Sequence, residues 1–422
     1  MVGFLTPEPN LEHLKKEAKA LHKAHRRRDP QVCAVLRHVR RFRDASDEEI
    51  LSADVPLTEV QFALAREYGF GSWPELRSVL VGLKPGADYV ADAEDNAVIL
   101  PDPPGGIGDS DSYAAAFSMA LSYLGAPADY ETVAGDSGVA FILQADALHK
   151  PHDANISQLD IGWWPLDPWG AMLRLEFLSD VYGVPMRWLP SVVDEYRSDS
   201  ARHYREHHEA EVTESLRAGR PVVAVVADAV HIVLGRDGGN PPLLGQVSRD
   251  SKARIRRLEH LPWALVVLGE PGRATDRRQA DAEALDFAIR LGRDEVDLSH
   301  LPGKSSGRRS WDLWASQLAD EDLCGPHFFH ANVVRHLRLH RTAAASYLRT
   351  MSGRHPAPAS RALKEAAQVY DSVVNQLDQA DTSKGQLATA DGRERLISLI
   401  REVMRLEATA QAHMAEALPA IP

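Results

Sequence analysis

Cysteine is scarce in this chain, which has only Cys33 and Cys324 among its 422 residues. Two cysteines cannot build a disulfide framework, so we expect a reducing compartment and a cytoplasmic location. Apolar runs are also short. None approaches the roughly 18–20 residues that a membrane-spanning helix needs, so no membrane association is expected. The opening residues MVGFLTP lack the basic start and apolar stretch of a secretory signal.

Motifs that hold nucleotides are missing as well. The run GGIG at 105–108 precedes a predicted helix, but it lacks the Lys-Ser/Thr pair and the full glycine spacing of a phosphate-binding loop. Zinc-finger spacing, an aromatic RNA-binding signature and a repeated basic stripe are absent too. No cofactor is therefore expected, and nucleic acid is not the expected partner.

The composition that is present is that of a globular protein, with 44% hydrophobic and 26% charged residues. The formal charge of −12 is uneven. Residues 11–43 carry eleven Lys/Arg against three Asp/Glu, a local charge of +8 that leaves −20 for the rest. The simplest interpretation of the basic segment is a solvated helix face. Docking on an acidic surface, of this chain or of a partner protein, is the alternative we retain.

The length of the chain suggests two or three domains. The spacing of its hydrophobic residues divides it into four parts. The parts are a helical module at 1–83, an acidic linker at 84–97, a mixed region at 98–272 and a helical region at 273–422. The mixed region is predicted to have helices at 112–125, 170–182 and 207–218, then strands at 222–227, 230–234 and 263–269. Helices followed by an antiparallel sheet predict an α+β fold.

The first part contains the sequences LKKEAKAL, RRRDPQ and FALAREYGFGSWPELRSVL. Together they resemble a short helical module that precedes ankyrin repeats in many bacterial proteins. The resemblance covers about 11–80, and no 33-residue ankyrin period follows it. It implies an interaction or packing module without chemistry of its own, with Tyr68, Phe70 and Trp73 in its small core.

The mixed region carries an ordered set of short signatures. They are SYAAAFSMALSYLG from Ser112, DSGVAF, FLSDVYGV, AGRPVVAVVADAVHIVLG and LPWALVVLGE. Their order resembles the papain-like bacteriocin-processing peptidases and the related acyltransferase of butirosin biosynthesis, over about 98–270. The resemblance implies a papain-like fold. It places the nucleophile position at Ser112 and the general base at His231, and these two residues are expected to be neighbours.

The sequence departs from this family at its chemistry. A helix dipole and a neighbouring histidine can hold a cysteine as thiolate, whereas the Ser112 hydroxyl would need concerted proton removal and an oxyanion hole. The family's oxyanion Gln has no match in 105–108. Asp250 is the candidate third member, although neither it nor Asn240 stands where the resemblance implies. The alternative is that Ser112 is an ordinary helix N-cap and that His231 is a satisfied, partly buried histidine.

Other residues of this region are candidates for ligand binding. The side chains expected to bind a ligand are Trp163, Trp164, Trp169, Asp111 and Tyr113. With Trp188, the tryptophans form either core or one wall of a cleft.

Several histidines have the spacing of metal ligands. Cys324, His327 and His330 are three apart, and His336 and His340 are four apart, a spacing that can direct ligands at one metal. Gly325-Pro326 interrupts the first group and no carboxylate triad accompanies it, so these residues are interpreted as core and surface histidines and no metal is expected. The charged neighbours of His203, His207 and His208 indicate a solvated face.

Three functions remain open. The first is a non-proteolytic papain-like protein that binds a small molecule, an acyl group or a peptide in a degenerate cleft. The second is a serine-dependent acyltransferase or hydrolase that uses Ser112 and His231. The third is a protein-interaction scaffold without a ligand cleft.

Overall fold

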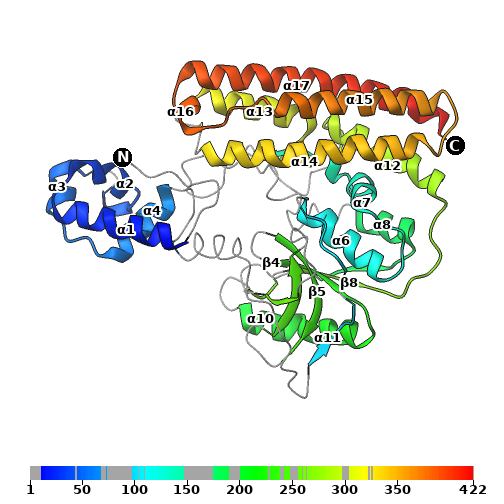
Figure 1. Ribbon diagram of the computed structural model, residues 1–422, viewed down its shortest axis with the longest axis horizontal. Helices are drawn as coiled ribbons and strands as arrows, with labels where there is room; N and C mark the ends of the chain where they lie inside the picture. The colour runs from blue at the N-terminus through cyan, green and yellow to red at the C-terminus, as the bar shows by residue number, and fades with distance from the viewer. Residues whose placement is uncertain are drawn as a thin grey trace. The chain divides into compact units, whose positions relative to one another are not determined.

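The structure is a computed structural model, shown in Figure 1. It describes residues 11–42, 45–67, 73, 97–102, 104–108, 110–146, 174–189, 200–226, 229–237, 242–247, 255–258, 260–262, 264–296, 304–321, 324 and 327–421. Within these ranges, no helix combines the length and the apolar character that crossing a bilayer requires.

The chain forms two compact units. The first comprises Met1–Gly86 with Lys150–Ser157, and the second comprises Ala87–His149 with Gln158–Pro422. One hydrophobic cluster in the second unit runs from Leu100 to Ile421, so the mixed region and the C-terminal helices share a core.

The first unit is built from short helices. They are α1 (Leu11–Arg26), a 3₁₀ turn (Pro30–Val32), α2 (Cys33–Leu36), a second turn (Arg40–Phe42), α3 (Asp47–Ser52) and α4 (Leu57–Glu67). Ser46 and Glu49 form a capping box that starts α3, because each side chain satisfies a backbone N–H that the helix leaves unpaired. Trp73 packs against the cluster of Leu14, Ala18 and Leu64, whereas Tyr68 and Phe70 lie outside the described residues.

The second unit contains an antiparallel sheet with the strand order β3-β8-β4-β5-β6-β7, and β1 pairs with β5. The strands are β1 (Val98–Ile99), β3 (Met186–Leu189), β4 (Val222–Val226), β5 (Ala229–Arg236), β6 (Leu243–Val247), β7 (Arg256–Arg257) and β8 (Ala264–Leu268). Every residue of β4 is buried, since helices cover both faces of the sheet at this strand. The predicted α+β class is confirmed.

Helices lie on both sides of this sheet (Figure 1). One face carries α6 (Ser112–Tyr123) and α8 (Leu175–Tyr182), and α7 (Tyr130–Asp136) packs on α6. The other face carries α10 (Ser200–His207) and α11 (Glu209–Arg217). Because α6 is rich in alanine and buried from Ser112 to Leu121, its backbone packs closely on β5 and α7.

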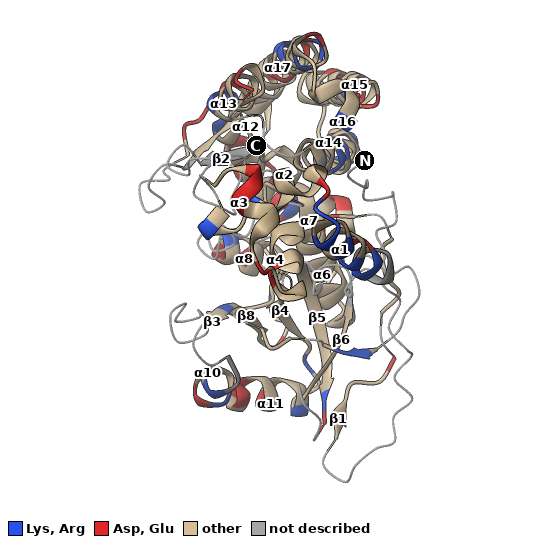
Figure 2. Cartoon of the chain, turned by 90° about the vertical axis from the view of Figure 1, so that its left-hand side faces the viewer, with Lys and Arg blue, Asp and Glu red and all other residues tan. Residues whose placement is uncertain are grey.

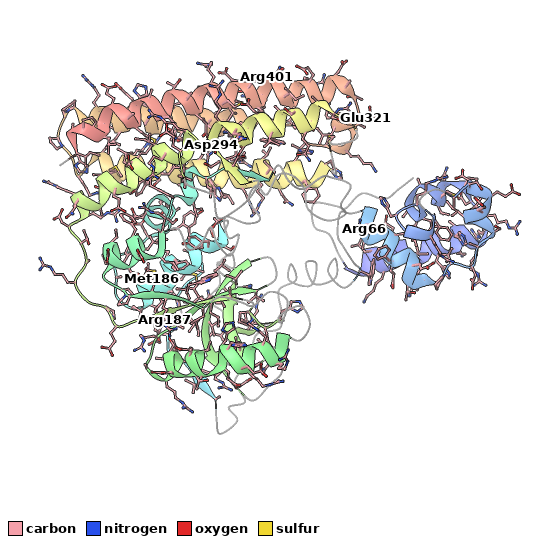
Figure 3. All side chains as sticks on the ribbon, turned by 180° about the vertical axis from the view of Figure 1, so that it is seen from behind. Arg66, Met186, Arg187, Asp294, Glu321 and Arg401 are labelled. Atoms are coloured by element: carbon pink, nitrogen blue, oxygen red, sulfur yellow. The ribbon has the colours of Figure 1, made fainter. Side chains whose placement is uncertain are left out.

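The C-terminal part is helical, as predicted. Its helices are α12 (Arg277–Gly292), α13 (Gly307–Ala319), α14 (His327–Ser352), α15 (Ala359–Leu377), α16 (Lys384–Leu387) and α17 (Ala390–Ala417). The long helices α14, α15 and α17 lie side by side (Figure 1). A two-stranded ladder of β2 (Gln144–Asp146) and β9 (Lys304–Ser306) also joins the two regions. After α12, Asp294 (Figure 3) accepts the Ser306 N–H at 2.8 Å.

A buried carboxylate strengthens this connection. Asp136, the last residue of α7, is fully buried and accepts hydrogen bonds from the hydroxyls of Tyr182 and Tyr347, each at 2.8 Å. Arg277 of α12 donates both terminal nitrogens to the same carboxylate, at 2.7 and 2.5 Å. Four elements, α7, α8, α12 and α14, therefore meet at one charged group.

Candidate functional site

The site begins at the first turn of α6. Asp111 is the N-cap residue, and its Oδ1 accepts the backbone N–H groups of Tyr113 at 2.9 Å and of Ala114 at 3.3 Å. These N–H groups have no partner inside the helix, so a side-chain acceptor at this position stabilises the helix start. The cap is thus Asp111, and the interpretation of Ser112 as the N-cap is wrong by one residue.

Ser112 connects this helix start to the sheet. Its Oγ accepts the backbone N–H of Val230 at 3.2 Å, although 118 positions separate the two residues. Val230 pairs with Val225 of β4, and the next residue, His231, pairs with both Ala224 of β4 and Val247 of β6. Ser112, which is 9% exposed, therefore joins the first turn of α6 to the start of β5 through a buried backbone N–H.

His231 follows this contact directly. It lies in β5 between Ala224 of β4 and Val247 of β6, and it is half-buried. The fold thus brings the start of α6 to the start of β5, the two elements that carry the residues expected to be neighbours. A direct hydrogen bond between Ser112 and His231 stays a prediction.

A carboxylate–histidine pair stands at the same helix end. Oδ2 of Asp111 lies 3.1 Å from Nε2 of His340 on α14, and both side chains are almost completely buried. Burial alone would raise the pKa of Asp111. The hydrogen bond from His340, the charges of His340 and His336, and the Ala114 N–H together lower this pKa to about 2. Tyr130 completes the surroundings, because its hydroxyl accepts the Asp111 N–H at 3.0 Å.

The sequence did not indicate this pairing. The carboxylate was expected after His231, and Asp250 lies outside the described residues. In the sequence, the spacing of His340 four residues after His336 points only to a possible metal ligand. Its partner is 229 positions away, and no local pattern encodes such a contact.

The expected ligand-binding side chains fall into two groups. Trp163, Trp164 and Trp169 lie outside the described residues. Tyr113 is buried, and its ring centroid is 4.6 Å from that of Phe117, so this phenol belongs to the core behind the helix start. Burial, with the charge of Asp111, raises the pKa of Tyr113. Its expected role in ligand binding stays a prediction.

The Cys324 region is a buried hydrogen-bonded cluster. His330 Nδ1 accepts the indole N–H of Trp314 at 3.0 Å, and Nε2 lies 2.5 Å from the Cys324 carbonyl oxygen. Both ring nitrogens are thus engaged with protein groups, which accounts for His330 without a metal. Burial lowers the pKa of His330 to about 4 and raises the pKa of the Cys324 thiol.

His203 and His207 of α10 and His208, the N-cap of α11, do not form the solvated face that their charged neighbours indicated. His203 and His208 are buried, and their ring centroids are 5.0 Å apart. Only His207 is exposed, and its ring lies 4.7 Å from that of His203. Burial, followed by the charge of His203, lowers the pKa of His208 to about 4, so this imidazole is neutral at pH 7.

Comparison with known proteins adds no assignment. No protein-family model matches the chain, and a search of the curated proteins finds no match.

Proposed function

We propose that residues 98–272 form a papain-like domain without peptidase chemistry, which binds a small molecule, an acyl group or a peptide at the junction of α6 and β5. The observation that carries this proposal is the contact of Ser112 with the Val230 N–H at 3.2 Å. At the position where the resemblance implies a nucleophile, the side-chain oxygen serves as a backbone acceptor.

The surroundings of Ser112 do not favour its ionisation. The helix dipole contributes only about 0.3–1 kcal/mol, which is far too little to ionise an alcohol. The adjacent residue Asp111 has a carboxylate, but it is already bonded to two backbone N–H groups and to His340. Neither cysteine supplies a substitute thiolate, because Cys33 and Cys324 are buried and burial raises both thiol pKa values.

Ligand binding is supported by the polar groups at this junction. His231 on β5 and His336 on α14 are half-buried. His336 is close enough for its charge to lower the pKa of Asp111. A few polar side chains at the edge of an apolar core are typical of sites that orient small ligands. In this proposal, α14 contributes to a site whose other parts come from α6 and β5.

The expected result is ligand binding without hydrolysis. In thermal unfolding of the full chain, dipeptides, N-acyl amino acids and acyl-pantetheine form the test panel. We expect at least one class to raise Tm with concentration, because a ligand of the native state stabilises it by mass action. His231→Ala should abolish the shift. His413→Ala on α17, also a half-buried histidine, should keep it. Quenched peptide substrates should stay uncleaved.

Two outcomes would contradict this proposal. Peptide or ester cleavage that disappears in Ser112→Ala would establish the serine-dependent enzyme instead. A panel without any Tm shift would favour the interaction scaffold.

One observation supports the scaffold as the second candidate. A cavity of about 450 Å³ lies between α13 and α17, lined by Asp312, Ala315, Met404 and Arg401 (Figure 3), and it does not include Ser112 or His231. A surface recess on a helix pair suits a protein partner.

A further inference from the structure

We propose that the first unit carries a binding site for an acidic peptide of a partner protein. This inference concerns a different unit and is independent of the function proposed above. The site is a cavity of about 410 Å³ between the last turn of α1 and the segment that joins α3 to α4. Arg26 and Arg28 line one side, and Leu51, Val55 and Leu57 line the other.

The two arginines are available to a ligand. Elsewhere in this unit, Arg37 pairs with Asp47 at 2.6 Å and Arg41 pairs with Glu59 at 2.5 Å. Among the described residues, Arg26 and Arg28 form no ion pair. Lys and Arg mark much of α1 in Figure 2. Arg26, the last residue of α1, and Arg28, two residues after it, both line the cavity. The planar guanidinium binds a carboxylate through two parallel hydrogen bonds, which suits it to this ligand.

The backbone at Arg28 is unusual for this residue type. Arg28 has φ of 60°, in the left-handed region. Asp29 N–H donates to Ala24 O at 3.1 Å and Arg28 N–H donates to His25 O at 2.8 Å, which ends α1 in a pattern whose left-handed residue is usually glycine. An arginine here costs conformational energy that glycine would avoid. Departures from local preference are concentrated at functional sites, so this one supports a role for the side chain.

The cavity is held in shape by two histidines. Nε2 of His22 is 3.1 Å from the Val55 carbonyl oxygen, and Nε2 of His25 is 2.8 Å from the Ile50 carbonyl oxygen. These contacts connect α1 to α3 and to the segment between α3 and α4. A site whose walls are already fixed loses less entropy when a ligand binds.

The lining selects an acidic peptide over a nucleic acid. Leu51 and Leu57 are half-buried and offer an apolar wall for an aliphatic side chain next to the bound carboxylate. Asp54 stands at the same cavity, where its charge opposes a closely spaced row of phosphates.

The experiment uses the full chain and a fluorescein-labelled ten-residue peptide of alternating Glu and Leu, with fluorescence anisotropy as the readout. We expect saturable binding that Arg28→Gly weakens at least tenfold, since a charge-assisted pair is lost. The same variant should show slower hydrogen exchange in α1, because glycine relieves the left-handed backbone. Arg27→Ala removes an equal charge from an exposed neighbour outside the cavity lining, and it should change affinity less than twofold.

Three results would overturn the proposal. The first is an absence of saturable peptide binding. The second is equal weakening by Arg27→Ala and Arg28→Gly, which would indicate attraction by diffuse charge. The third is tighter binding of duplex DNA than of the peptide at the same salt concentration, with affinity falling steeply as salt rises. A Gln/Leu peptide of the same length is the matched ligand control, and it should not bind.

Discussion

Asp136→Asn is expected to lower the free energy of unfolding by about 3–5 kcal/mol, because it removes one partner of a buried ion pair. Asparagine keeps the shape of the side chain but not its charge. Arg277 would then lose its two short contacts with Asp136 and keep only Asp281, whose Oδ1 lies 3.4 Å from Nε. The hydroxyls of Tyr182 and Tyr347 would lose a charged acceptor. Urea unfolding followed by tryptophan fluorescence reports on this unit, since seven of the eight tryptophans lie beyond residue 158.

Asp371→Asn is the matched control for this experiment. Asp371 of α15 pairs with Arg349 of α14, and both side chains are about half exposed. An exposed pair of this kind contributes less than about 1 kcal/mol. Tyr347→Phe, which removes a single hydrogen bond of the cluster, should fall between the two. Equal effects of Asp136→Asn and Asp371→Asn would show that the Asp136 cluster does not join the mixed region to the C-terminal helices.

The helices and the main strands were accessible from the sequence. The predicted helix at 112–125 matches α6 (Ser112–Tyr123), and the predicted strands at 222–227 and 230–234 match β4 (Val222–Val226) and β5 (Ala229–Arg236). Capping residues, helical spacing and runs of valine are local signals, so one sequence suffices to identify them. Strand β3 (Met186–Leu189) was missed, because its MRWL sequence has neither length nor clear alternation.

The candidate site was only partly accessible. The resemblance indicated Ser112 and His231, and the fold brings Ser112 to the residue before His231. The partner of Asp111 could not be found in this way, since His340 belongs to a helix that was interpreted as part of a separate packing region. Long-range pairs of this type depend on how α14 packs against α7 and α15, which no spacing rule specifies.

The burial of His203 was misjudged for a related reason. Its neighbours Arg202, Arg205 and Glu206 are exposed, so the segment looks polar when it is read linearly. On α10, however, His203 and Tyr204 point to the buried side. A short amphipathic helix with a histidine on its apolar face cannot be told from a solvated one by composition.

Asp111→Asn is expected to destabilise the protein at pH 7 by about 2 kcal/mol, and this difference should disappear in acid. The pKa of Asp111 in the folded state is about 2, below the ordinary 3.8 of an unfolded aspartate. A lowered folded-state pKa means that ionised Asp111 stabilises the protein above about pH 4, and this contribution is lost as pH falls towards 2. Asparagine caps a helix nearly as well as aspartate, so the variant isolates the charge and the contact with His340. The measurement is the free energy of unfolding of both proteins in urea at pH 7, 4 and 2.

Asp129→Asn supplies the control, because Asp129 caps α7 through the Thr132 N–H at 2.8 Å, and no described histidine contacts it. That variant should lose well under 1 kcal/mol at pH 7, since the cap survives. His340→Ala should reproduce most of the Asp111→Asn effect, and the double variant should lose less than the sum of the two, because both changes break one interaction. A difference between the wild type and Asp111→Asn that stays constant from pH 7 to pH 2 would contradict the role of the charge. Additive losses would show that Asp111 and His340 do not interact. In that case α14 would not be coupled to the start of α6, and the C-terminal helices would not contribute to the site at Ser112.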